Sequence, residues 1–156
     1  TIMRLTLTEN PMKKTAILFS LLVSVSAFAT NISFTYFGNE GGRQSYYACS
    51  YAEGQTESYL ELLGATNIDV RCTGGINGGW SVQPVSIRAS YDLPVVAGNS
   101  VEEVSIKGDS FNPACGLNVR IINELLKTFT NVEVVKKSDS CAFQSSNYFY
   151  KLNIAK

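Results

Sequence analysis

The chain alternates between two spacings of its apolar residues. Apolar and polar residues alternate along 32–36, 67–72 and 85–91, which is the pattern of strands buried on one face. Between the first two segments, apolar residues recur at steps of three and four from 47 to 63. That spacing puts them on one face of a helix, and Gly64 is a natural helix end. The first half therefore predicts the order strand, helix, strand, strand.

The second half of the chain repeats this order. Short alternating segments at 104–107, 131–135 and 148–154 predict three strands. Between the first two of them, a helical spacing of apolar residues runs to Phe129, and Pro113 stands where a helix can begin.

A local match between the halves points to duplication. Residues 61–70 and 124–134 share six identical and two conservative positions, with one extra residue in the second segment. In each half one cysteine opens the helix and another follows the next strand. We interpret the chain as a duplicated β-α-β-β unit, with pseudo-repeats at about 31–92 and 101–156. The alternative is chance similarity between two amphipathic helix-strand pairs.

Two such units predict an α+β fold. We expect a two-layer α/β sandwich in which two helices cover one face of a single, roughly six-stranded sheet. The polar alternates of the strands would form the open face of that sheet. These residues are Ser33, Thr35, Asp69, Arg71, Ser86, Arg88, Glu103, Ser105, Lys107, Glu133 and Lys137.

The four cysteines predict two disulfides, and geometry selects the pairing. In a β-α-β crossover the two strands are parallel and the helix runs back, so the helix start lies near the end of the second strand. Cys49 should therefore meet Cys72, and Cys115 should meet Cys141. Bridges that close loops of this size stabilise a fold by about 3 kcal/mol each.

The start of the chain carries a signal for export. Two lysines follow Met12, an apolar run spans 16–25, and Ala27-Phe28-Ala29 has small residues at both ends. This is the three-part pattern of a secretory signal peptide, here 12–29, with cleavage expected after Ala29. The alternative, an uncleaved anchor helix, is disfavoured because the apolar run is short for a bilayer.

The exported product is expected to be one domain, 30–156, and residues 1–11 are expected to be an upstream extension outside the fold. This part holds 10 basic and 12 acidic residues, a net charge of −2, so nothing favours a nucleic-acid partner. No later segment has transmembrane length. The leader is typical of bacteria, which predicts a periplasmic or secreted protein; the sequence leaves its oligomeric state open.

Little in the composition supports catalysis. The chain has no His, so the usual Ser or Cys triads and most zinc sites are excluded, and no cofactor or metal motif is present. Cys72 would lack a base as a nucleophile, and a bridge is the better interpretation. Glu53, Glu57 and Glu61 stand four apart on one helix. They are candidates for a small carboxylate-based envelope hydrolase, although a solvated helix face has the same spacing.

The strongest candidate site is the end of the fold where loops would gather. Aromatic and polar residues on a glycine-rich frame are typical of ligand surfaces. Those expected there are Arg43, Tyr46, Tyr47, Asn77 and Trp80. We therefore expect a non-catalytic binding or interaction module for an envelope protein or a glycan.

Two alternatives to that site stay open. In the first, the glycines near Trp80 form a wide hairpin turn and Trp80 only covers the disulfide. In the second, the protein is structural or inhibitory and docks through its open sheet face, where Arg71 and Arg88 would make the contacts.

Overall fold

The computed structural model describes five stretches of the chain. They are residues 29–40, 43–76, 82–108, 114–141 and 147–156, with only the backbone described at 39–40 and 43–44. The expected signal peptide lies outside the described residues up to Ala29, where the first strand begins. Asn77 and Trp80 also lie outside them.

The first half forms an antiparallel sheet of three strands. Its elements are β1 (Ala29–Tyr36), α1 (Cys49–Leu62), β4 (Thr66–Ile76) and β5 (Val82–Asp92). The strand order is β1-β5-β4, and β5 is antiparallel to both neighbours. β1 and β4 are therefore parallel, and α1 connects them as a crossover helix.

The second half builds a separate sheet with the same plan. Its elements are β6 (Val101–Lys107), α2 (Cys115–Leu126), β7 (Val132–Ser138) and β8 (Phe149–Ala155). The order is β6-β8-β7, again antiparallel, with the last strand in the middle. In both halves the spatial order is thus first strand, last strand, second strand.

A short ribbon lies outside the two main sheets. It pairs β2 (Asn39–Glu40) with β3 (Arg43–Gln44) between β1 and α1.

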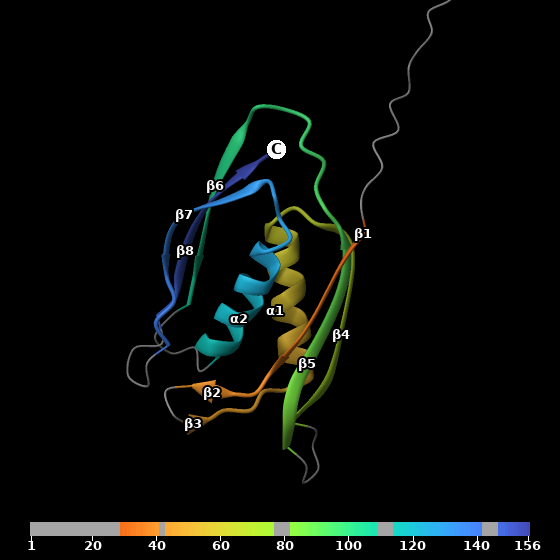
Figure 1. The fold of residues 1–156 in the computed structure, drawn as a ribbon, viewed down its shortest axis with the longest axis vertical. Helices are drawn as coiled ribbons and strands as arrows, with labels where there is room; N and C mark the ends of the chain where they lie inside the picture. The colour runs from red at the N-terminus through yellow and green to blue at the C-terminus, as the bar shows by residue number, and fades with distance from the viewer. Residues whose placement is uncertain (1–28, 41–42, 77–81, 109–113, 142–146) are drawn as a thin grey trace, which may run out of the picture.

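The two helices lie between the two sheets (Figure 1). The structure thus has an α+β fold with two disulfides, but its main strands form two sheets rather than the single sheet of six expected from the sequence. In each half the last strand pairs with both other strands of that half, so each sheet is complete by itself. Each sheet then has one apolar face to bury, and both bury it against the shared helix layer.

One core joins the halves across the helix layer. The inner residues of β8, Tyr150, Leu152 and Ile154, are fully or nearly fully buried. Tyr91 of β5 stacks on Phe129, which follows α2, with ring centroids 5.7 Å apart. The apolar residues of both halves therefore belong to a single cluster.

The outer faces of both sheets are polar, as the alternation predicts, with one correction. Glu133 pairs with Asn153 on the outer face, but Lys137 pairs with the buried Tyr150 and so lies on the inner face. A register shift between Val134 and Lys136 inserts one residue. A bulge of this kind reverses the facing of every later residue in the strand.

Candidate functional site

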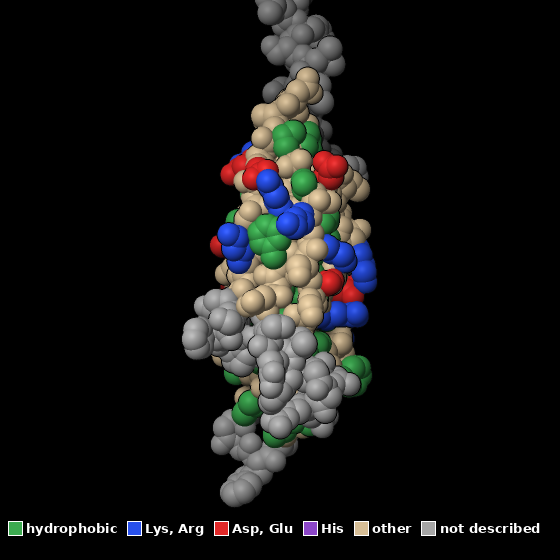
Figure 2. All heavy atoms as spheres, turned by 90° about the vertical axis from the view of Figure 1, so that its left-hand side faces the viewer, with side chains coloured by type: hydrophobic (Ala, Val, Ile, Leu, Met, Phe, Trp, Pro, Cys, Tyr) green, Lys and Arg blue, Asp and Glu red, His purple; other side chains and the backbone are tan. Residues whose placement is uncertain are grey.

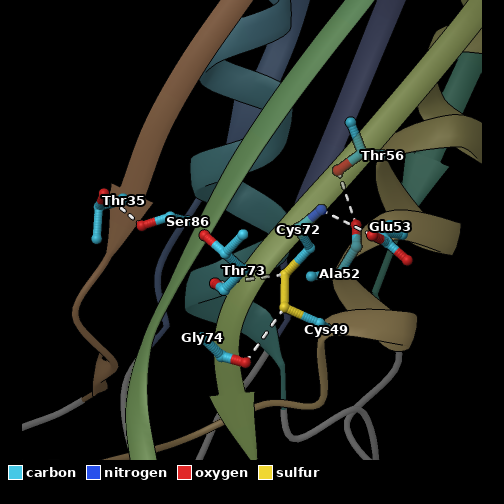
Figure 3. The surroundings of a disulfide bond; sticks show 9 residues. All are labelled: Thr35, Cys49, Ala52, Glu53, Thr56, Cys72, Thr73, Gly74 and Ser86. Carbon is cyan, nitrogen blue, oxygen red and sulfur yellow. Dashed lines mark hydrogen bonds between the residues drawn. A yellow bond between two sulfur atoms is a disulfide. The ribbon is translucent and has the colours of Figure 1, made fainter.

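The first disulfide ties the start of α1 to the middle of β4. Cys49 is the first residue of the helix and is bridged to Cys72, with their Cα atoms 5.4 Å apart (Figure 3). This is the pair that crossover geometry predicts. Beyond Cys72, however, β4 continues to Ile76 rather than giving way to a loop. Gly74 and Gly75 are therefore strand residues, and both have positive φ.

Gly75 lets the strand approach the chain that enters α1. A Cβ at this position would lie 2.5 Å from the backbone oxygen of Tyr47. That same oxygen accepts a hydrogen bond from the N–H of Ile76 at 2.9 Å. Only glycine permits this close backbone contact, which holds the entrance of α1 against the edge of β4.

A helix side chain also caps the edge of β4. The backbone N–H of Cys72 donates to the carboxylate of Glu53 at 2.7 Å (Figure 3). Glu53 stands one turn after Cys49 on α1, so the bridge and this hydrogen bond fix the same stretch of strand. This contact gives Glu53 a structural role.

The second disulfide makes the same connection in the other half. Cys115 is the first residue of α2 and is bridged to Cys141, with their Cα atoms 5.6 Å apart. This is the second expected pair. Both helix starts lie at the same end of the molecule as the β2-β3 ribbon (Figure 1). The two bridges therefore pin one end of the fold.

The expected binding residues at this end differ in their surroundings. Tyr47 is 8% exposed, and its ring lies 6.1 Å from that of Tyr36 and 6.2 Å from that of Tyr51. Its ring is thus part of the core at the entrance of α1. Tyr46 is half-buried. Arg43 lies in β3, where only the backbone is described.

The other two carboxylates considered for catalysis, Glu57 and Glu61, are exposed on α1. Asp92 accepts a hydrogen bond from the side-chain amide of Asn67 at 2.6 Å. Within the described stretches, no group of three or more potential ligand side chains is placed to hold a metal ion.

The buried tyrosines form polar contacts inside the core. The hydroxyls of Tyr59 and Tyr148 lie 2.8 Å apart, and Tyr150 donates to the side-chain oxygen of Asn123 at 3.2 Å. Burial, with a smaller contribution from the charge of Asp139, raises the pKa of Tyr150 to about 12. Burial also raises the pKa of Tyr59. These phenols stay protonated at neutral pH and form hydrogen bonds inside the core.

The open face of the first sheet holds a shallow hollow of about 260 Å³. Arg71 and Arg88 line it and lie directly opposite each other on neighbouring strands. Arg71 forms an ion pair with Asp69 at 3.1 Å, and both side chains are exposed. The face is polar and solvated, as expected from the sequence.

A groove between α2 and β7 was not predicted from the sequence. It encloses about 500 Å³, with Leu126 and Val134 among its apolar residues. Lys127, Lys136 and Lys137 also line it. The bulge in β7 turns Lys137 toward this side, and a pattern of alternation contains no sign of that bulge.

No helix in the described part of the chain is long and apolar enough to cross a membrane. Comparisons of the chain with family models, with curated proteins and with solved structures give no match.

Proposed function

We propose that this chain is an exported, non-catalytic binding module that engages its ligand at the disulfide-pinned end. The observation that carries the proposal is the convergence of both helix starts and both bridges at that end (Figure 1). Two crosslinks at one end restrict the backbone that they join, and a restricted surface loses less entropy when it binds. Arg43, Tyr46, Asn77 and Trp80 supply the ligand contacts, and the buried Tyr47 supports them.

Export accounts for the bridges. Disulfides persist in oxidising compartments, and all four cysteines are paired. Together with the leader sequence at 12–29, this supports a periplasmic or secreted location. Expression of the full chain in a bacterium, followed by fractionation and N-terminal sequencing, tests it. Mature protein beginning at Thr30 outside the cytoplasm is expected, whereas an uncleaved chain in the cytoplasm would refute it.

Duplication of a β-α-β-β unit explains why the two halves share an order of elements. It is supported by the same strand order in both sheets and by equivalent bridges. In this proposal the sheet of the second copy covers the side of the helix layer that the first sheet does not cover.

An envelope protein or a glycan is the proposed ligand class. The test uses a double variant that carries both Tyr46→Ala and Trp80→Ala. The control variant is Val95→Ala, because Val95 lies in the connection from β5 to β6 and is 47% exposed. All three proteins are applied to a glycan array and to crosslinked envelope extracts. We expect the double variant to lose the glycan signal or the crosslinked partner that the wild type and the control retain. Unchanged binding by the double variant would overturn the site.

A further inference from the structure

The two halves bury equivalent residues to different extents. Val70 of β4 and Val134 of β7 occupy the same place in the local match between the halves. Both face inward, since they pair with the buried Ala89 and Leu152. Val70 is only 9% exposed, but Val134 is 41% exposed. The helix layer therefore covers β4 and leaves part of the inner face of β7 open.

The position of α2 explains the difference. The guanidinium of Arg120 on α2 lies 5.8 Å above the ring of Phe34 in β1, and α2 packs against β1. Contact with the first sheet thus holds α2 away from β7. The space left between them is the groove of about 500 Å³ lined by Leu126 and Val134.

The outer edges of β4 and β7 also differ in how far other parts of the fold cover them. β4 and β7 are both edge strands. The edge of β4 is closed by two contacts, in which Cys72 donates to Glu53 and Ile76 donates to Tyr47. Glu53 stands four residues after its helix cysteine, and the residue four after Cys115 is Val119, which has no side-chain acceptor. Across the described stretches, no strand pairs with the outer edge of β7.

The backbone of β7 has groups directed to that open edge. The N–H of Ala155 donates to the carbonyl of Asn131 at 2.9 Å, which sets the register of hydrogen-bonded pairs between the strands. Pairs alternate in an antiparallel ladder, so the N–H and C=O of Val132 and Val134 point away from β8. An edge of this kind can accept an added strand.

The charges around the groove select the occupant. Lys127 is paired with Glu124 at 2.8 Å and Lys137 with Asp139 at 3.3 Å, while the described residues offer Lys136 no ion-pair partner. Exposed pairs of this kind are weak and exchange readily with a new anion. A second copy of this chain would set lysines against lysines along the edge, which costs energy. An acidic occupant complements the groove.

We propose that the groove between α2 and β7 binds an extended acidic segment of a partner protein, which adds as a fourth strand to β7. Apolar side chains of that segment lie over Leu126 and Val134 on the inner face of the sheet. Its alternate side chains, which are acidic, face Lys136, because Lys136 pairs with Lys151 and so lies on the outer face. The backbone bonds give affinity, and the charges give selectivity and orientation. This surface is separate from the disulfide-pinned end, so either proposal can fail alone.

The test uses a fluorescein-labelled, end-blocked peptide of alternating valine and glutamate, with fluorescence anisotropy as the readout. Its counterpart of alternating valine and lysine is the charge control. A version N-methylated at alternate residues removes backbone donors without any change in the protein. We expect the acidic peptide to bind, the basic peptide not to bind, and N-methylation to weaken binding by about fivefold.

Two protein variants locate the contact. Lys136→Glu is expected to weaken binding on the order of tenfold at low salt, while Lys107→Glu on β6 leaves it unchanged. Lys107 is a matched control because it also lies on the outer face of this sheet, where basic side chains gather (Figure 2), but it stands beside Phe149 on β6, the opposite edge strand. Equal losses in both variants would reduce the interaction to general charge attraction and overturn the proposal. So would equal binding of the basic peptide, or indifference to N-methylation.

Discussion

Removing the two bridges one at a time measures how each half depends on its crosslink. The variants are Cys49→Ala with Cys72→Ala, and Cys115→Ala with Cys141→Ala. The bridges close loops of 23 and 26 residues. In the chain-entropy model these lengths correspond to about 3.4 and about 3.5 kcal/mol of stability. Cys115 is only 1% exposed, so its truncation also leaves a void worth about 1 kcal/mol, and the second variant should lose more.

Guanidinium unfolding followed by circular dichroism gives the free energy of unfolding for each variant and for the wild type. Peptide mapping under non-reducing conditions identifies the bridge that remains. We expect both variants to fold with lower stability, the second lower than the first. Losses below about 1 kcal/mol in both would refute the entropic reasoning. Bridges that cross between the halves would refute the crossover geometry itself.

Three further predictions test the packing around β4, β7 and the core. Glu53→Ala leaves the N–H of Cys72 without its acceptor and should cost about 1 kcal/mol of unfolding free energy, whereas Glu53→Gln should retain most of it because the amide oxygen still accepts. Val70→Ala should cost about 2 kcal/mol and Val134→Ala about 0.5 kcal/mol, and equal losses in denaturant unfolding would contradict their different burial. Stability should fall as pH rises from 10 to 12, because the unfolded chain ionises near pH 10 while burial holds the pKa of Tyr150 at about 12. Unfolding measured across this range should show a smaller fall in Tyr150→Phe, and an identical fall would contradict the assignment.

Local pattern was sufficient to predict the main helices and strands and both cysteine pairs. Alternation and helical spacing depend only on neighbours in the chain, so they identify which side of an element is buried. Crossover geometry then places each helix start beside the strand that follows it, which is why Cys49 was expected to meet Cys72. The length of β4 was underestimated because Gly74 and Gly75 resemble a loop, although here they allow the strand to approach Tyr47.

The sequence thus determined the order of elements, their buried faces and the crosslinks. The tertiary structure alone decided that the strands form two sheets, that Tyr47 is a core residue, and that the bulge in β7 turns Lys137 inward. It also decided that α2 packs against β1 and leaves Val134 partly exposed. The physical reason is that an apolar face specifies burial but not what covers it. Strand partners and helix placement depend on contacts between residues far apart in the chain, which a local pattern does not contain.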